Sequence, residues 1–327
     1  MRIRGFNGHV LCATHIQQRL KMRAIFAEHR PHVVFHAAAF KHVPLMESAP
    51  DEAVVNNVGG TLVVAEEAAA AGVERFVNIS TDKAADPISA MGASKAMAEL
   101  VVRDVGRRHP DSRFCSVRFG NVLGSRGSVV PIFRKQIDGG GPVTVTHPEM
   151  TRYFMSISEA VQLVLQAASM TGDSASEAGI FILNMGEPVR IIDVAHKMIS
   201  FAKNGHSSDI EIVYTGLRPG ERMHERLVGS REQSGPTAHP LIDALQPAPD
   251  STGDVAPGHA DFRNRVESLL AVGDAHADRE AVIGHMRSFL PTYEPFSLVD
   301  GVDGPFIGHT ADPEAAATAA TATRPVG

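Results

Sequence analysis

The chain has 327 residues, 43% of them hydrophobic, which is enough for one large or two modest domains with a sizeable core. Its formal net charge of −6 argues against a nucleic-acid partner. No apolar run approaches the ~18–20 residues of a membrane-spanning helix, and no secretory signal pattern is present. The distant Cys12 and Cys115 indicate neither a disulfide framework nor a metal site, so we expect a cytoplasmic protein without a bound metal.

Predicted helices and strands alternate in the first part of the chain. Pro31 ends the first helix and Gly72 ends the second. The predicted helices cover residues 17–30, 50–71 and 89–109, and the predicted strands cover residues 32–36, 73–79 and 114–118. Strands separated by helices of this length are typical of βαβ units, so we predict an α/β fold with a doubly wound parallel, Rossmann-like sheet.

The pattern loosens after Gly124. Further helices are predicted at residues 156–170, where Ser156 precedes Glu159 as an N-cap, and at 192–203, with strands at 180–184 and 210–214. After about residue 234, Pro, Gly, Ala, Asp and Thr dominate, apart from one helical island near residues 260–290. We predict that residues 311–327 are disordered, because they cannot bury enough apolar surface to offset chain entropy.

A polar cluster follows the strand predicted at residues 73–79. It consists of Ser80, Thr81, Asp82 and Lys83, and Lys95 follows twelve residues after Lys83 in the next helix. In parallel α/β sheets, chemistry collects at the carboxyl ends of the strands, so an acid, a base and a hydroxyl here are candidates for an active site. Taken alone, the cluster is more typical of a polar turn that caps a strand.

Six segments together resemble one known family. They are the runs at residues 36–47, 80–84, 91–95, 118–122, 150–154 and 216–221. In this order they resemble the CapD-like polysaccharide-biosynthesis branch of the extended short-chain dehydrogenases/reductases, the nucleotide-diphosphate-sugar 4,6-dehydratases. The resemblance extends over roughly residues 22–240.

The chain departs from this family in two places. The family's Gly-x-Gly-x-x-Gly turn is absent, since Gly5 and Gly8 precede no suitable helix. We therefore expect the fold to lack its first βα units and its affinity for NAD or NADP to be reduced. Met91 stands where most short-chain dehydrogenases have a catalytic tyrosine, as it does in a subset of the family similar to the large membrane-anchored dehydratases.

The resemblance implies a role for each candidate residue. Thr81 would hydrogen-bond the carbon-4 hydroxyl, Asp82 would be the acid and Lys83 the base, and Lys95 would hold the nicotinamide ribose. Further residues implied at the cofactor are Ala37, Ala38, Ala39, Lys41, Asn57 and Ser80. Those implied at the substrate are His42, Asn121, Arg152, Arg218 and Glu221, with the two arginines suited to a pyrophosphate. A structural Arg218–Glu221 ion pair and a surface position for Lys41 and His42 are the simpler alternatives.

These implications give a domain division and a function. Residues 1–125 would form a partial NAD(P)-binding domain and residues 126–234 a substrate lobe interleaved with returning sheet elements at about 179–203. Residues 235–327 would be a variable C-terminal region. The leading hypothesis is a 4,6-dehydratase that acts on a nucleotide-diphosphate sugar such as UDP-N-acetylglucosamine and serves polysaccharide biosynthesis. Assembly as a homo-oligomer is compatible with this hypothesis. The alternatives are a nucleotide-sugar epimerase on the same fold and a catalytically dead, truncated remnant.

Overall fold

A six-stranded sheet organises the computed structural model, which describes residues 15–125, 127–170, 179–202, 210–247, 259–275 and 277–296, and the backbone of residues 2–4 and 10–12. The strand order is β13-β14-β10-β5-β4-β3. The parallel strands are β3 (Val33–His36), β4 (Arg75–Ile79), β5 (Arg113–Arg118) and β10 (Ile180–Leu183). Two antiparallel strands, β14 (Ile242–Pro247) and β13 (Glu232–Pro236), extend the sheet beyond β10. The predicted α/β fold with a parallel-dominated sheet is confirmed.

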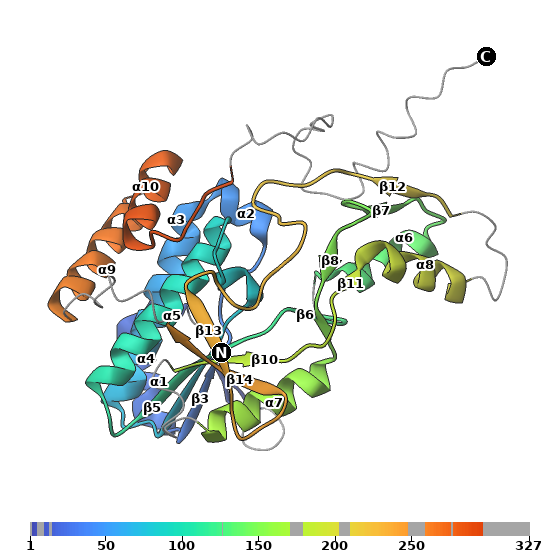
Figure 1. Ribbon diagram of the computed structural model, residues 1–327. Coiled ribbons are helices and arrows are strands. Elements are labelled where there is room, and N and C mark those ends of the chain that lie inside the picture. The colour runs from blue at the N-terminus through green and yellow to red at the C-terminus, as the bar shows by residue number, and fades with distance from the viewer. Residues whose placement is uncertain are drawn as a thin grey trace, which may run out of the picture.

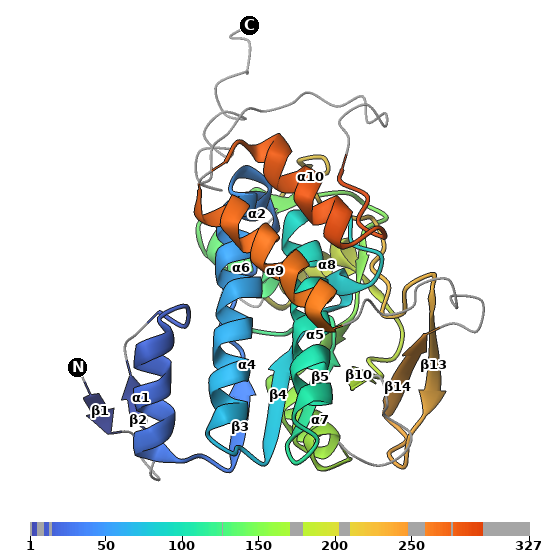
Figure 2. The same ribbon diagram turned by 90° about the vertical axis from the view of Figure 1, so that its left-hand side faces the viewer.

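Helices cover both faces of the sheet (Figures 1 and 2). One face carries α1 (Arg19–His29), α4 (Gly60–Ala70) and α5 (Ala90–Arg108), and the other carries α7 (Ile157–Met170). Alternation along β4 explains the two layers, because successive side chains of a strand point to opposite faces. Phe76 packs in the cluster that contains α4 and α5, whereas its neighbour Val77 packs in the cluster that contains α7.

The helix predicted at residues 50–71 consists of three consecutive pieces. They are α3 (Pro50–Ala53), a π-helical turn over Val54–Gly59, and α4. Gly72, with φ of 71°, follows the end of α4, where a left-handed residue is expected after a helix. A short helix, α2 (Val43–Ser48), precedes this stretch. The π turn is a local irregularity of a kind that often occurs at functional sites.

A second lobe is built from short strands and two helices. It contains β6 (Asn121–Val122), α6 (Val129–Asp138), β7 (Val143–Val145), β8 (Thr151–Arg152), β9 (Phe154–Met155), β11 (Val189–Arg190), α8 (Ile191–Ala202) and β12 (Ile212–Tyr214). Residues 179–203 are predicted to return to the sheet, but of this stretch only β10 joins it. Helix α8 instead packs against α6 and β7, because Ile191, Ala195 and Ile199 form one apolar face that is buried with Phe133.

The C-terminal region contributes two helices to the core. The predicted helical island is two helices, α9 (His259–Asp274) and α10 (Arg279–Phe289). Both pack on the outside of the helices of the α4–α5 face (Figure 2), α9 against α3 and the π turn and α10 against α3 and α5. Leu269, Met286 and Tyr293 are at most 1% exposed there. The surrounding Pro/Gly-rich composition hides these apolar positions in the sequence. The predicted boundary at residue 235 falls inside β13, and the predicted disordered tail lies outside the described residues.

No helix in the ranges given above is both long and apolar enough to span a membrane.

Replacing Leu269 tests whether α9 belongs to the core. Leu269 is 1% exposed, so Leu269→Ala should lower the free energy of unfolding by about 3 kcal/mol through lost burial and a cavity. Leu20→Ala on α1 is the matched control, because Leu20 is 78% exposed and its truncation should change stability by less than about 0.5 kcal/mol. Urea unfolding measures both, and equal effects would show that α9 does not contribute to the core.

Candidate active site

The candidate site begins where β4 ends. Ser80 N–H donates to Val117 O at 2.8 Å and Asp82 N–H donates to Phe119 O at 3.1 Å, so the backbone continues alongside β5 beyond the strand proper. A short 3-10 turn over Asp82–Ala84 follows. The polar residues predicted from the sequence therefore lie at the carboxyl edge of the parallel sheet, where ligand sites of this fold class form.

Thr81, Asp82 and Lys83 contact one another directly. Thr81 Oγ1 donates to Asp82 Oδ1 at 2.9 Å, and Lys83 Nζ lies 2.9 Å from the same oxygen. The Asp82 side chain is fully buried, and its second oxygen, Oδ2, has no hydrogen-bond partner among the described residues. An unpaired buried carboxylate oxygen is costly unless something else binds it, so Oδ2 is a position for a donor supplied by a ligand.

Helix α5 brings Lys95 to the same edge. The helix begins with Ser89, whose Oγ accepts a hydrogen bond from Gly92 N–H at 3.0 Å. A Cβ atom on Gly92 would lie 2.3 Å from Lys83 O, so only glycine allows the first turn of α5 to approach the Asp82–Ala84 turn this closely. Lys95 is 5% exposed and its Nζ donates to Ile79 O at 2.7 Å. Burial lowers the pKa of Lys95 to about 8, with Glu99 acting in the opposite direction.

Met91 occupies the first turn of α5 and carries no polar group toward the site. It is 4% exposed and packs with Val43, Met46 and Ala53 from the preceding helices. Met91 therefore offers no group for proton transfer at this edge of the sheet.

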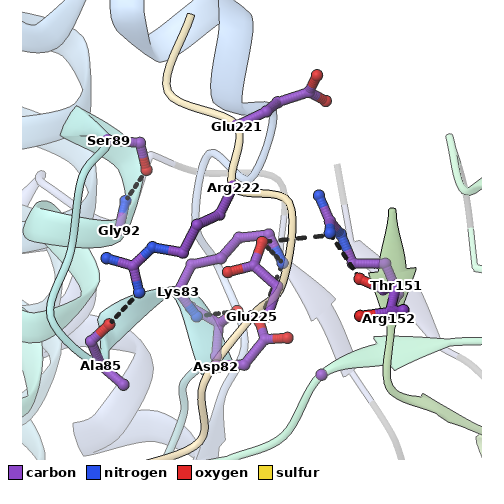
Figure 3. A network of polar contacts seen from close by, with 12 residues as sticks. Asp82, Lys83, Ala85, Ser89, Gly92, Thr151, Arg152, Glu221, Arg222 and Glu225 are labelled. Atoms are coloured by element: carbon purple, nitrogen blue, oxygen red, sulfur yellow. Dashed lines mark hydrogen bonds and ion pairs between the residues drawn. The ribbon is translucent and has the colours of Figure 1, made fainter. Parts of the chain in front are cut away.

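Glu225 is a site residue that the sequence analysis missed. Its Oε1 lies 3.4 Å from Lys83 Nζ and 3.7 Å from Arg152 Nε, and its side chain is 6% exposed. Figure 3 shows Asp82, Lys83, Glu225 and Arg152 grouped together, whereas Glu221 lies away from the group. Burial alone would lower the pKa of Lys83, but Asp82 and Glu225 outweigh it and raise that pKa, so Lys83 rests as an ammonium. The sequence signal was weak, because Glu225 contacts only residues distant in the chain.

A second ionic network lies beneath the site. Glu99 accepts hydrogen bonds from Ser80 Oγ at 2.5 Å and from Arg118 at 2.8 and 2.6 Å. Arg118 also donates to Glu232 of β13 at 2.7 and 2.9 Å. Ser80, predicted at the cofactor, thus uses its hydroxyl to connect the end of β4 to α5.

The loop after β3 contains most of the residues predicted at the cofactor. Ala37 and Ala38 are exposed and Ala39 is half-buried, so the backbone there is accessible to a ligand. Asn57, from the π turn, bonds both backbone groups of Phe40, at 2.8 and 3.0 Å, and Ser94 Oγ at 2.9 Å. Asn57 therefore uses both its amide oxygen and its amide nitrogen to fix this loop against α5.

The remaining predicted residues lie around these groups. His42 and Lys41 are exposed, and the His42 ring lies beside Gly127. His36 is buried, and burial together with the positive charge of Lys95 lowers its pKa to about 3, so it is neutral. Asn121 is half-buried in β6.

The two predicted substrate arginines differ in their surroundings. Arg152 is buried and its Nη1 donates to Thr151 O at 2.7 Å and Met223 O at 3.1 Å. Arg218 is 61% exposed and pairs with Glu221 at 2.6 Å, which is the simpler alternative considered from the sequence. An exposed guanidinium on a Pro-Gly turn is available to an anion, whereas Arg152 is already held.

The residues present fit one end of a nicotinamide cofactor. Lys95 Nζ and the open backbone of residues 37–39 lie at the carboxyl edge, where a nicotinamide ribose would be held. The sequence contains no Gly-x-Gly-x-x-Gly turn, so the pyrophosphate end lacks that type of cradle.

Comparison with known proteins decides the family. The model of the family described as polysaccharide biosynthesis protein matches residues 4–247. The chain belongs to this family. EpsC of Bacillus subtilis strain 168, a probable polysaccharide biosynthesis protein, is 50% identical over 241 residues, which make up 72% of this chain and 39% of EpsC. The chain thus spans about two fifths of the length of this relative.

Two further proteins are similar to this member of the polysaccharide biosynthesis family, one in sequence and one in structure. The UDP-glucose 4-epimerase of Rickettsia rickettsii (strain Sheila Smith) is 40% identical over 210 residues, 64% of this chain and 59% of the epimerase. The X-ray structure of Pen from Bacillus thuringiensis superposes with a TM-score of 0.64 at 32% identity, covering 73% of this chain and 72% of Pen. The family resemblance inferred from the sequence motifs is confirmed.

Replacing Lys95 tests its buried charge. The pKa of Lys95 is 10.5 in the ordinary case and about 8 in the folded protein. Between these values the unfolded chain binds more protons, so the stability of the wild type rises with pH through this window. Lys95→Met removes that dependence. We expect the stability of Lys95→Met relative to wild type to be greatest at pH 7 and to fall by up to about 3 kcal/mol by pH 10.5.

Urea unfolding at several pH values measures this difference. Lys21→Met on the exposed surface of α1 is the control, because a solvated ammonium carries no burial cost. If the difference in free energy of unfolding between Lys95→Met and the wild type stays constant with pH, the lowered pKa of Lys95 is contradicted.

Proposed function

We propose that this chain is a nucleotide-diphosphate-sugar 4,6-dehydratase that acts on a substrate such as UDP-N-acetylglucosamine. The single observation that carries the proposal is the Asp82–Lys83 pair, with Asp82 Oδ2 buried and without a partner in the described part of the chain. Elimination of water needs an acid and a base that act together on neighbouring atoms, and this pair supplies both.

The Asp82–Lys83 pair holds the one proton that the elimination of water must deliver. Lys83 rests as an ammonium 2.9 Å from Asp82 Oδ1, so one proton transfer between them gives an amine and a carboxylic acid with no proton taken from solvent. The Lys83 amine then removes the carbon-5 proton. The Asp82 acid protonates the carbon-6 hydroxyl, which leaves as water while the C5–C6 double bond forms. The pair returns to ammonium and carboxylate.

The other residues hold and orient the sugar. Thr81 Oγ1 lies beside Asp82 and would turn toward the carbon-4 hydroxyl, and Lys95 would hold the nicotinamide ribose. When bound, NAD(P)+ would supply hydride acceptance from carbon 4 and hydride return to carbon 6. The carbon-4 hydroxyl proton passes to solvent on oxidation, and on reduction the Lys83 ammonium returns a proton to carbon 5 and is reprotonated from solvent. The exposed Arg218 would bind the pyrophosphate, exchanging its contact with Glu221 for a more highly charged partner.

A nucleotide-sugar epimerase is the second candidate, because an epimerase is among the relatives. It has less use for an acid–base pair beside the nicotinamide, since 4-epimerisation removes and restores hydrogen at carbon 4 without expelling water. Asp82 with its unpaired Oδ2 therefore favours the dehydratase.

Product mass separates these functions. The whole chain is incubated in D2O with UDP-N-acetylglucosamine and NAD+ or NADP+, and the nucleotide sugars are separated by liquid chromatography, which resolves isomers, before mass spectrometry. We expect a product that has lost one water and gained deuterium at carbon 5. Asp82→Asn should slow its formation by at least about 10²-fold, because the general acid is lost.

Asp193→Asn is the matched control, since Asp193 is a surface carboxylate paired with Arg190 at 2.9 Å. An isomer of unchanged mass would support the epimerase, and a folded chain that converts nothing would support the catalytically dead remnant.

A further inference from the structure

Glu225 is buried between two cations, Arg152 and the proposed catalytic base Lys83. One oxygen, Oε1, faces both Lys83 Nζ at 3.4 Å and Arg152 Nε at 3.7 Å. A carboxylate that is 9% exposed overall is retained in a protein interior when it is paired, and here its partners are the candidate base and a predicted substrate ligand.

The segment that carries Glu225 is anchored on both sides. Thr151 N–H donates to Met223 O at 3.1 Å, and Thr151 Oγ1 lies 2.9 Å from His224 Nδ1. On the other side, Arg222 hydrogen-bonds the carbonyls of Ala85 and Asp86, just beyond the catalytic turn (Figure 3 shows the contact with Ala85). The position of Glu225 is therefore fixed relative to both β8 and the Asp82–Ala84 turn.

The charges of the cluster balance. Asp82 and Glu225 are the anions that face Lys83, and Arg152 is the second cation. With Glu225 present, Lys83 is held between two carboxylates, at 2.9 Å from Asp82 and 3.4 Å from Glu225. Without it, one carboxylate would face two cations in a largely buried site, and the ammonium form of Lys83 would lose a main source of stabilisation.

We infer that Glu225 is a positioning residue that holds the Lys83 ammonium against Asp82 and keeps Arg152 beside it. The inference deepens the proposed function and rests on it for the catalytic meaning of Lys83. Glu225 does not touch the reacting atoms in this account. It fixes the resting protonation state from which the acid and the base are generated.

The test measures the protonation of Lys83 without relying on turnover. The whole chain is labelled with a trace of an amine-reactive reagent across a pH series, and the modification of Lys83 is quantified by mass spectrometry against that of the other lysines. Glu225→Gln keeps the size and polarity of the side chain but removes the charge. We expect the midpoint of Lys83 labelling to fall by about one pH unit or more.

A second variant, expected to shift the Lys83 labelling midpoint in the opposite direction, ensures that the test does not depend on a single substitution. Arg152→Met removes the cation that opposes the Lys83 ammonium, so the midpoint should rise. Glu267→Gln is the control, because Glu267 is an exposed glutamate paired with Arg263 at 2.9 Å and should leave the midpoint unchanged. Circular dichroism confirms that each variant is folded.

A fall with Glu225→Gln and a rise with Arg152→Met support the inference. Midpoints that do not move, or that move in the same direction in both variants, overturn it. If the chain turns over UDP-N-acetylglucosamine, Glu225→Gln should also shift the alkaline limb of the kcat profile to lower pH. Labelling that follows the expectation without turnover would uphold the role of Glu225 and reject the proposed reaction, so the two failures are distinguishable.

Discussion

The buried pairing of Arg118 with Glu99 is the interaction on which the geometry of the site depends. Arg118 ends β5 and Glu99 lies one helical turn after Lys95, so their contacts at 2.8 and 2.6 Å fix α5 relative to the sheet. Ser80, at the end of β4, donates to the same carboxylate. Breaking a buried pair by removing one partner typically costs about 3–5 kcal/mol, because a charge is left without compensation. Misplacing α5 would separate Lys95 from the Asp82–Lys83 pair.

The site itself has two layers of charge with different roles. The lower layer, Glu99 with Arg118, uses well-formed hydrogen bonds and is closed to a ligand. The upper layer, Asp82 with Lys83, retains an unpartnered oxygen within the described residues, and Lys83 also pairs with Glu225 from the segment between β12 and β13. In the proposed reaction a proton moves only within the Asp82–Lys83 pair, while the Glu99–Arg118 pairing keeps its charges and holds α5 in place.

The features that could be predicted from the sequence are those set by residues close together in the chain. Ser156 and Glu159 form the expected reciprocal cap, at 3.2 and 2.8 Å, and Asp82 and Lys83 lie together because they are adjacent in the chain. The contacts of Glu225 could not be predicted, because they join segments that only the tertiary fold brings together. The same holds for α9, whose helical pattern was visible but whose packing partner was not. The π turn that orients Asn57 has no sequence signal.

Titration calorimetry with UDP-N-acetylglucosamine, in the presence of NAD+ or NADP+, tests most directly whether this polypeptide carries a nucleotide-sugar site. The account predicts saturable binding at one site, weakened about tenfold or more by Arg218→Ala through the loss of a charged hydrogen bond. Arg190→Ala is the control, because Arg190 also pairs with an acid three residues away but lies on β11. No binding by the folded chain, or equal weakening by both variants, would contradict the account.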